Sequence, residues 1–240
     1  MTPKSQTLFH FTKSIESLKS ILSGGLQPRY CLEDVKYLMP SLDHIGYPMV
    51  CFCDIPISRL SEHTTFYGEY GLGLTKEWGL KNGLEPVIYS TRAGIATRVF
   101  ECLDKLTDAD IGEHGDEVLR IWNDLLPRIK PLNGKMVIGG EFVDKEFYQE
   151  NEWRYVPDAF HMAFEDKDEF ERKRAQYNEE VRGYTLGLTP SDVVYIFVKN
   201  ENEIPVVFDF IQNQMGQFPL NDIKILSSRI TSLEALSRDL

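Results

Sequence analysis

Residues 148–156, with the sequence YQENEWRYV, constrain the fold more than any other stretch of this 240-residue chain. Side chains two residues apart on a β-strand point to the same face of the sheet. A strand here would therefore project Glu150, Glu152 and Arg154 from one side. Two carboxylates held this close repel each other, so that face needs water or a cation beside it.

The paired carboxylates admit two interpretations. A solvated strand face with Arg154 as the local counter-ion is common, and surface ion pairs of that kind contribute little to stability. A site that binds sugar hydroxyls or stabilises a cationic transition state is the alternative, because a fixed carboxylate stabilises positive charge that develops beside it. The residues alone leave both interpretations open.

The predicted elements mix strands and helices without regular alternation. Strands are predicted at residues 8–11, 47–55, 70–74, 86–89, 136–138, 153–156, 193–198 and 223–226. Helices are predicted at residues 15–22, 59–70, around Trp78, and at 93–130, 165–180 and 230–240. Residues 206–211 fit either a strand or a helical turn. This order of elements is typical of an α+β protein.

The domain organisation follows from the residues that begin and end the helices and from the absence of long linkers. Thr12 or Ser14 can cap the first helix, because a hydroxyl can accept from a free backbone N–H. Gly24 and Gly25 end that helix, since glycine adopts the left-handed conformation of a C-cap. The chain contains no repeat, low-complexity tract or long linker. We therefore expect one domain over residues 1–240, with a helical insertion at about 92–131.

Composition excludes several classes of function. The formal net charge of −11 makes a broad basic surface for duplex nucleic acid improbable. No apolar run approaches the ~20 residues of a membrane span, and residues 1–7 lack an apolar signal core. A cytoplasmic protein is therefore expected. Neither a GxGxxG nor a GxxxxGK(S/T) loop is present, and neither is a GxSxG or HExxH motif.

The cysteines do not have the spacing of a metal site. A structural zinc site needs paired CxxC motifs or a following histidine pair, and this chain has neither. We expect no metal and no disulfide, and buried free thiols at Cys31, Cys51, Cys53 and Cys102.

His10 and Thr12 are candidate binding residues on the first predicted strand. They share a face, whereas Phe9 and Phe11 point to the other side. The imidazole and the hydroxyl together offer donors and acceptors suited to ribose hydroxyls or an amide. A histidine packed in the core is the alternative.

Two further places carry candidate binding residues. Arg29 and Tyr30 follow the first helix, where Arg29 can pair with a phosphate and Tyr30 can stack on a base or nicotinamide. An ordinary helix-exit loop is the alternative. Tyr67 lies four residues after His63, so the two side chains share a helix face. They can form a polar wall of a site or a half-exposed structural cluster.

Five unusual segments occur along the chain: LFHFTK at residues 8–13, PRYCLED at 28–34, PMVCFCDIP at 48–56, YGEYGLGLTKEW at 67–78 and ENEWRY at 150–155. In these segments and their order the chain resembles the AbiGi family of bacterial abortive-infection proteins. The resemblance spans most of the chain and implies a role in phage defence, with a cognate toxin or another defence-system protein as partner. Family members are described as the antitoxin-side partner of a nucleotidyltransferase-like toxin.

A second resemblance is to ADP-ribosyltransferase-like folds such as the DarT toxins. It implies a mixed β core with a helical insertion, and NAD as the cofactor. By this resemblance Glu152 is the catalytic carboxylate beside an oxocarbenium-like cation, Glu150 orients the nucleophile and His10 grips the ribose. Tyr30 and Tyr67 are alternative candidates for the middle polar or aromatic motif of such enzymes. The cofactor-binding set is His10, Thr12, Arg29, Tyr30 and Tyr67.

Three hypotheses follow. The first is a phage-defence protein with an ADP-ribosyltransferase-like fold that acts on NAD; it predicts that Glu152→Gln abolishes turnover with the melting temperature nearly unchanged. The second is a catalytically inert antitoxin that neutralises its toxin by binding, for which an acidic chain that masks a basic surface is well suited. The third is a nucleotide-binding sensor.

Overall fold

The computed structural model describes residues 5–40, 42–103, 105, 114–138, 141–164 and 166–238. By its internal contacts the chain divides into two compact units, each built from separate segments. The first unit comprises residues 1–27, 51–84 and 185–240, and the second comprises residues 28–50 and 85–184. One domain with an insertion at about 92–131 stays a prediction, and residues 104 and 106–113 of that insertion lie outside the described residues.

The first unit is built on a mostly antiparallel sheet with the order β12-β11-β4-β1-β3. Strand β4 pairs antiparallel with both β1 and β11, and β12 pairs parallel with β11. The run VVYIFV of β11 is apolar throughout, as expected of a strand covered on both faces. The strands are β1 (Thr7–Thr12), β3 (His44–Cys53), β4 (Tyr70–Thr75), β11 (Val193–Val198) and β12 (Ile230–Ser232), of which only residues 51–53 of β3 belong to this unit.

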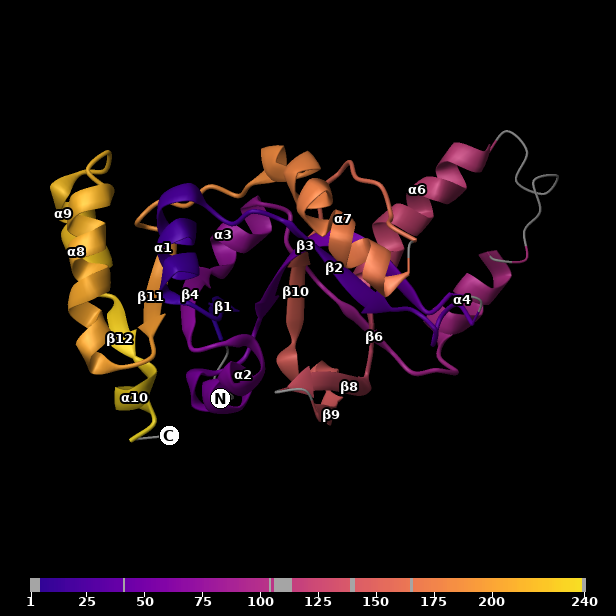
Figure 1. The fold of residues 1–240 in the computed structure, drawn as a ribbon, viewed down its shortest axis with the longest axis horizontal. Coiled ribbons are helices and arrows are strands. Elements are labelled where there is room, and N and C mark those ends of the chain that lie inside the picture. The colour runs from indigo at the N-terminus through magenta and orange to yellow at the C-terminus, as the bar shows by residue number, and fades with distance from the viewer. Residues whose placement is uncertain are drawn as a thin grey trace. The chain divides into compact units, whose positions relative to one another are not determined.

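A capping residue sets the start of the first helix of this unit. The Oγ of Ser14 accepts from the Ser17 N–H at 3.1 Å and so caps α1, which confirms the predicted start. Later in the chain, α8 and α9 run side by side (Figure 1). The helices are α1 (Ile15–Gly24), η1 (Ile57–Arg59), α2 (Leu60–Tyr67), α3 (Lys76–Lys81), η6 (Glu201–Glu203), α8 (Ile204–Gln214), α9 (Leu220–Ser227) and α10 (Leu233–Leu236).

The second unit contains the longer part of β3, which pairs antiparallel with β2 (Arg29–Asp34). Strand β10 (Glu152–Tyr155) is the other neighbour of β3 and pairs antiparallel with β5 (Glu85–Pro86). The remaining strands form two small sheets. Strand β6 (Ile88–Ser90) pairs with β7 (Ile129–Pro131), and β8 (Asn133–Ile138) pairs with β9 (Glu141–Glu146). The helices are α4 (Ile95–Leu103), α6 (Gly115–Leu125), η3 (Leu126–Arg128), η4 (Phe147–Glu150), α7 (Lys167–Glu180) and η5 (Arg182–Tyr184).

The α+β prediction is confirmed, but two elements near the C-terminus were assigned to the wrong class. Residues 223–226 were predicted as a strand and lie in α9, where Ile223 and Leu226 are buried at helical i, i+3 spacing. Residues 230–240 were predicted as a helix and begin with β12, followed by the four-residue α10. Short apolar runs are ambiguous because three or four residues do not resolve the period. Within the described residues, no helix is long and apolar enough to cross a membrane.

The adjacent glycines at the end of α1 provide a matched test of its C-cap. Gly25 has φ 86°, and an added Cβ would overlap the carbonyl oxygen of Leu186. Gly24 is helical with open space around it. We expect Gly25→Ala to lower the free energy of unfolding by about 1–3 kcal/mol, and Gly24→Ala to leave it unchanged or raise it by up to ~1 kcal/mol. Urea titration of both variants measures the difference. An equal change in the free energy of unfolding would contradict the role of Gly25 as the C-cap.

Candidate functional site

Glu152 and Arg154 lie on one face of β10, as their spacing predicted. Their side chains are buried, whereas Trp153 and Tyr155 between and after them are partly exposed. Glu150 does not share that strand: it ends the 3-10 turn η4, and Asn151 follows with φ 43°. Asparagine tolerates this left-handed conformation better than most residues, so the chain can turn between Glu150 and β10. The expectation that both carboxylates project from one strand was therefore wrong for Glu150.

Lys130 of β7 joins the two carboxylates. Its Nζ lies 2.8 Å from Oε2 of Glu150 and 2.5 Å from Oε2 of Glu152. The ammonium also lies 4.5 Å from the ring centroid of Phe147, within the range of a cation–π interaction. The sequence analysis missed Lys130, because nothing in its local spacing connects it with residues twenty positions further along the chain.

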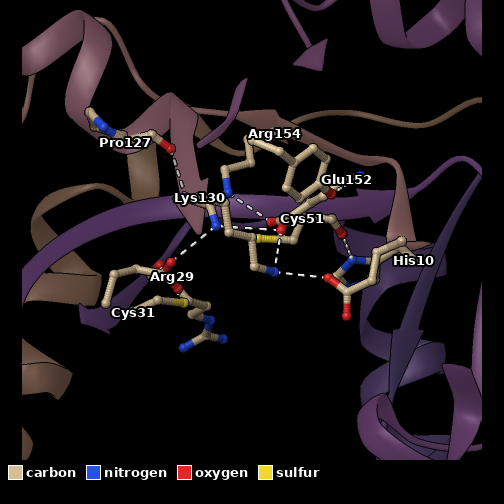
Figure 2. A network of polar contacts seen from close by, with 11 residues as sticks. His10, Arg29, Cys31, Cys51, Pro127, Lys130, Glu152 and Arg154 are labelled. Atoms are coloured by element: carbon tan, nitrogen blue, oxygen red, sulfur yellow. Dashed lines mark hydrogen bonds and ion pairs between the residues drawn. The ribbon is translucent and has the colours of Figure 1, made fainter. Parts of the chain in front are cut away.

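Arg154 holds Glu152 from the other side (Figure 2). Its Nε donates to Oε1 of Glu152 at 2.7 Å, and its Nη1 donates to the Pro127 carbonyl oxygen at 2.7 Å. Its Nη2 lies 3.1 Å from Oε2 of Glu33 on β2. The guanidinium is only 1% exposed, so each of these bonds replaces a contact with water. Both oxygens of Glu152 thus accept from a cation, Oε1 from Arg154 and Oε2 from Lys130.

Carboxylates and cations are paired in this cluster, in which the Glu33 side chain is 26% exposed and the others are at most 11% exposed. Lys145 of β9 completes the set, with its Nζ 3.3 Å from Oε1 of Glu150. Three carboxylates then face three cations: Glu33, Glu150 and Glu152 against Lys130, Lys145 and Arg154. Paired charges of this kind are tolerated in a protein interior, whereas removing one partner leaves an uncompensated buried charge. We call these six residues the charge network.

The charge network fixes the ionisation of Glu152. Burial by itself raises the pKa of its carboxyl, but the charges of Arg154 and Lys130 and their hydrogen bonds outweigh burial. The net result is a pKa below the usual value of a glutamate. Glu152 is therefore an anion at neutral pH, although it is 5% exposed. The prediction that Glu152 lies on a solvated strand face was therefore wrong. The prediction that Arg154 is its counter-ion is confirmed.

His10 and Thr12 belong to the first unit, on β1. Nδ1 of His10 lies 2.8 Å from the carbonyl oxygen of Cys51 (Figure 2). A carbonyl only accepts, so Nδ1 carries the proton and Nε2 is an acceptor. Burial lowers the pKa of this imidazole and favours the neutral ring. Phe9 and Phe11 pack into the core on the other face of the strand, as predicted.

Tyr67 also belongs to the first unit. Its ring stacks on His63 with the centroids 4.4 Å apart, which confirms the shared helix face. His63 is buried and lies against Phe11, with the ring centroids 5.6 Å apart. In this arrangement the pair extends the aromatic core of the first unit.

Arg29 and Tyr30 belong to the second unit and begin β2 rather than forming a turn. Arg29 is exposed. The Tyr30 backbone N–H donates to Oδ1 of Asn178 at 2.7 Å, and its hydroxyl donates to the His161 carbonyl at 2.8 Å. Its ring packs on Tyr177, and burial raises the pKa of the phenol to about 12. The structure thus makes Tyr30 part of the core of the second unit. Of the predicted site residues in this unit, Glu150 and Glu152 are members of the charge network.

The cysteines are free thiols. Cys53 is buried, Cys31 and Cys51 are partly exposed, and Cys102 is exposed on α4, so the expectation of four buried thiols holds only for Cys53. Across the part of the chain that the structure describes, no group of three or more histidine, cysteine, aspartate or glutamate side chains is placed to hold a metal ion.

Replacing Glu152 tests whether the charge network stabilises the fold. We expect Glu152→Gln to lower the free energy of unfolding at pH 7 by about 3 kcal/mol or more, because Arg154 and Lys130 lose a buried counter-charge. This replaces the expectation of an unchanged melting temperature. Glu171→Gln removes a half-exposed carboxylate paired with Arg174 and should change stability by less than about 0.5 kcal/mol. Urea unfolding of both variants makes the comparison.

The same experiment has a pH dependence of known sign. A lowered pKa in the folded state stabilises above the unfolded value of about 4.3 and loses that contribution as pH falls through the folded value. The stability gap between the parent protein and Glu152→Gln should therefore be constant from pH 7 to 5 and shrink below pH 4. A gap that did not change with pH would contradict the ionised network.

Comparison with known proteins places the chain in a family. The family described as "Putative abortive phage resistance protein AbiGi, antitoxin" matches residues 25–199. The "Abortive phage resistance protein AbiGi" of Lactococcus lactis subsp. cremoris is 32% identical to this chain. The alignment covers 88% of this chain and 98% of that relative. No solved structure matches the chain. The segment 25–199 includes the whole charge network, and the extent of both matches shows that this chain belongs to the AbiGi family of abortive phage resistance proteins.

Proposed function

We propose that this chain is the antitoxin of an abortive-infection system and neutralises a cognate toxin by binding it. The family description, which names an antitoxin, supports the proposal. The observation that carries it is the state of Glu152, whose two oxygens are both bonded to buried cations. A carboxylate held in this way is a poor partner for a cation that develops in a transition state, because its charge is already neutralised.

Helices α4 and α6 offer a surface suited to such binding. They pack against each other through Phe100 and Trp122, with ring centroids 5.0 Å apart. Ile95 and Val99 lie one turn apart on α4 and are 72% and 42% exposed, and Ile121 of α6 is 46% exposed. Exposed apolar side chains of this kind are typical of protein-binding surfaces. The net charge of −11 would also favour a partner with a basic surface.

An NAD-dependent enzyme with an ADP-ribosyltransferase-like fold is the second candidate. The observation in its favour is His10, a neutral imidazole whose Nε2 can accept from a ribose hydroxyl. In this proposal His10 and Thr12 bind NAD, with Arg29, Tyr30 and Tyr67 as further contacts, and Glu152 is the catalytic carboxylate assisted by Glu150. The enzyme would need Glu152 to exchange at least one of its cations for substrate during turnover.

A growth-rescue experiment tests the antitoxin proposal. The proteins encoded next to this chain are expressed singly to find one that arrests growth, and the chain is then co-expressed. We expect rescue, together with a stable complex on size-exclusion chromatography. The double variant Ile95→Asp, Val99→Asp should weaken the complex by about tenfold or more, because charges would be buried at an apolar contact. Leu80→Asp makes the same change at a 64% exposed leucine of α3 and should not weaken it.

The two candidates differ in their response to His10→Gln and to NAD. The glutamine amide can still donate to the Cys51 carbonyl, so the fold is retained while the imidazole is lost. The antitoxin proposal expects full rescue by this variant, and no release of nicotinamide from NAD by the parent protein, alone or in the complex. Loss of rescue together with nicotinamide release by the parent protein would favour the enzyme. The absence of any rescue or complex would refute the antitoxin.

A further inference from the structure

The first unit contains an open pocket of about 390 Å³ against β11 and β12. This pocket is separate from the charge network, since all of its lining residues belong to the other unit. Its volume lies at the lower end of the range of small-molecule sites, roughly 300–1,000 Å³, and fits a ligand of one or two rings. The lining combines aliphatic, aromatic, hydroxyl and cationic side chains, among them Ile57, Leu236, Tyr195, Phe197, Thr231 and Arg229.

Tyr195 gives the pocket a flat aromatic wall, and Phe197 lies behind it. They are two residues apart on β11, and their rings stack with centroids 5.7 Å apart and an interplanar angle of 20°. Phe197 is fully buried beneath the wall, whereas Tyr195 is partly exposed. The pairing of β11 with β4 shifts register between Val193 and Tyr195. An irregularity of this kind re-aims side chains, and bulges are frequent next to binding sites.

Arg229 supplies a positive charge that no acid of the described chain neutralises. Its Nη1 donates to the carbonyl oxygens of Pro190 (2.7 Å) and Val193, which fix the guanidinium in place. Within the described residues, no carboxylate forms an ion pair with it and no acceptor binds its Nε or Nη2. An arginine left without an acid beside a pocket is notable in a chain with 37 acidic residues against 26 basic ones.

We propose that this pocket binds a small planar aromatic anion, a carboxylate of one or two rings. The ring would stack on Tyr195, because offset stacking is favourable between aromatic faces. The carboxylate would accept from Arg229, whose remaining donors suit the planar geometry of that anion. Ile57 and Leu236 would cover the edges of the ring, and the hydroxyl of Thr231 offers one more polar contact. The proposal is independent of the antitoxin role.

The test uses the full chain with methyl groups of isoleucine, leucine and valine labelled for NMR. The probe is 2-naphthoate, and the uncharged control is 2-naphthalenemethanol, which has the same ring system. We expect saturable shifts of the Ile57 and Leu236 methyls with naphthoate and at least about tenfold weaker binding of the alcohol, since one charged hydrogen-bonding partner is lost. Raising the salt concentration should weaken only the naphthoate.

Two variants locate the binding. Arg229→Gln keeps an amide donor for the carbonyls of Pro190 and Val193 but removes the charge, so naphthoate should bind about tenfold more weakly and the alcohol as before. Arg238→Gln makes the same change at an arginine that is 63% exposed and does not line the pocket, and should have no effect. Leu236→Trp fills the pocket and should abolish binding of both compounds. Far-UV circular dichroism checks that each variant is folded.

Three results would overturn the proposal: no binding of naphthoate, equal binding of naphthoate and alcohol, or unchanged binding by Leu236→Trp. If Arg229→Gln does not fold, the comparison of the two probes at low and high salt still decides whether a positive charge selects the ligand. Growth rescue by the antitoxin plays no part in any of these measurements, so failure of one proposal leaves the other intact.

Discussion

The contact between Glu152 and Arg154 is the interaction on which the second unit depends. Arg154 is 1% exposed and bonds to Glu152, to Glu33 and to the Pro127 carbonyl, so it ties β10 to β2 and to the turn before β7. Lys130 connects the same carboxylate to Glu150. A buried charge without its partner is strongly unfavourable, so these segments can pack only in a register that keeps every pair.

This constraint also bears on function. A carboxylate that stabilises a reacting cation has to meet the substrate, whereas Glu152 already meets two side-chain cations. The acidic pair is part of the charge network, and the proposed binding functions therefore involve other surfaces of the protein. Exposed apolar side chains on α4 and α6 suit a protein partner, and the pocket beside β11 suits a small anion.

Elements with a strong local signal were predictable. The apolar run of β11, the serine cap of α1 and the stacked pair His63 and Tyr67 all follow from periodicity and capping chemistry. Strands β2 and β9 were missed because their sequences, RYCLED and EFVDKE, carry charges within the strand and have no continuous apolar run. Strand β9 pairs with the preceding strand β8, and β2 pairs with β3, and the local sequence of neither strand reports this pairing.

The sequence by itself determined the family of this protein, its α+β class and the common face of Glu152 and Arg154, because strand periodicity is a local property. Only the tertiary structure decided whether those charges meet water or each other. Glu33 is 121 residues from Arg154 and Lys130 is 22 residues from Glu152, so their pairing exists only after the chain has folded. Burial then made the pairing obligatory, because in a low-dielectric interior an ionised side chain requires an opposite charge.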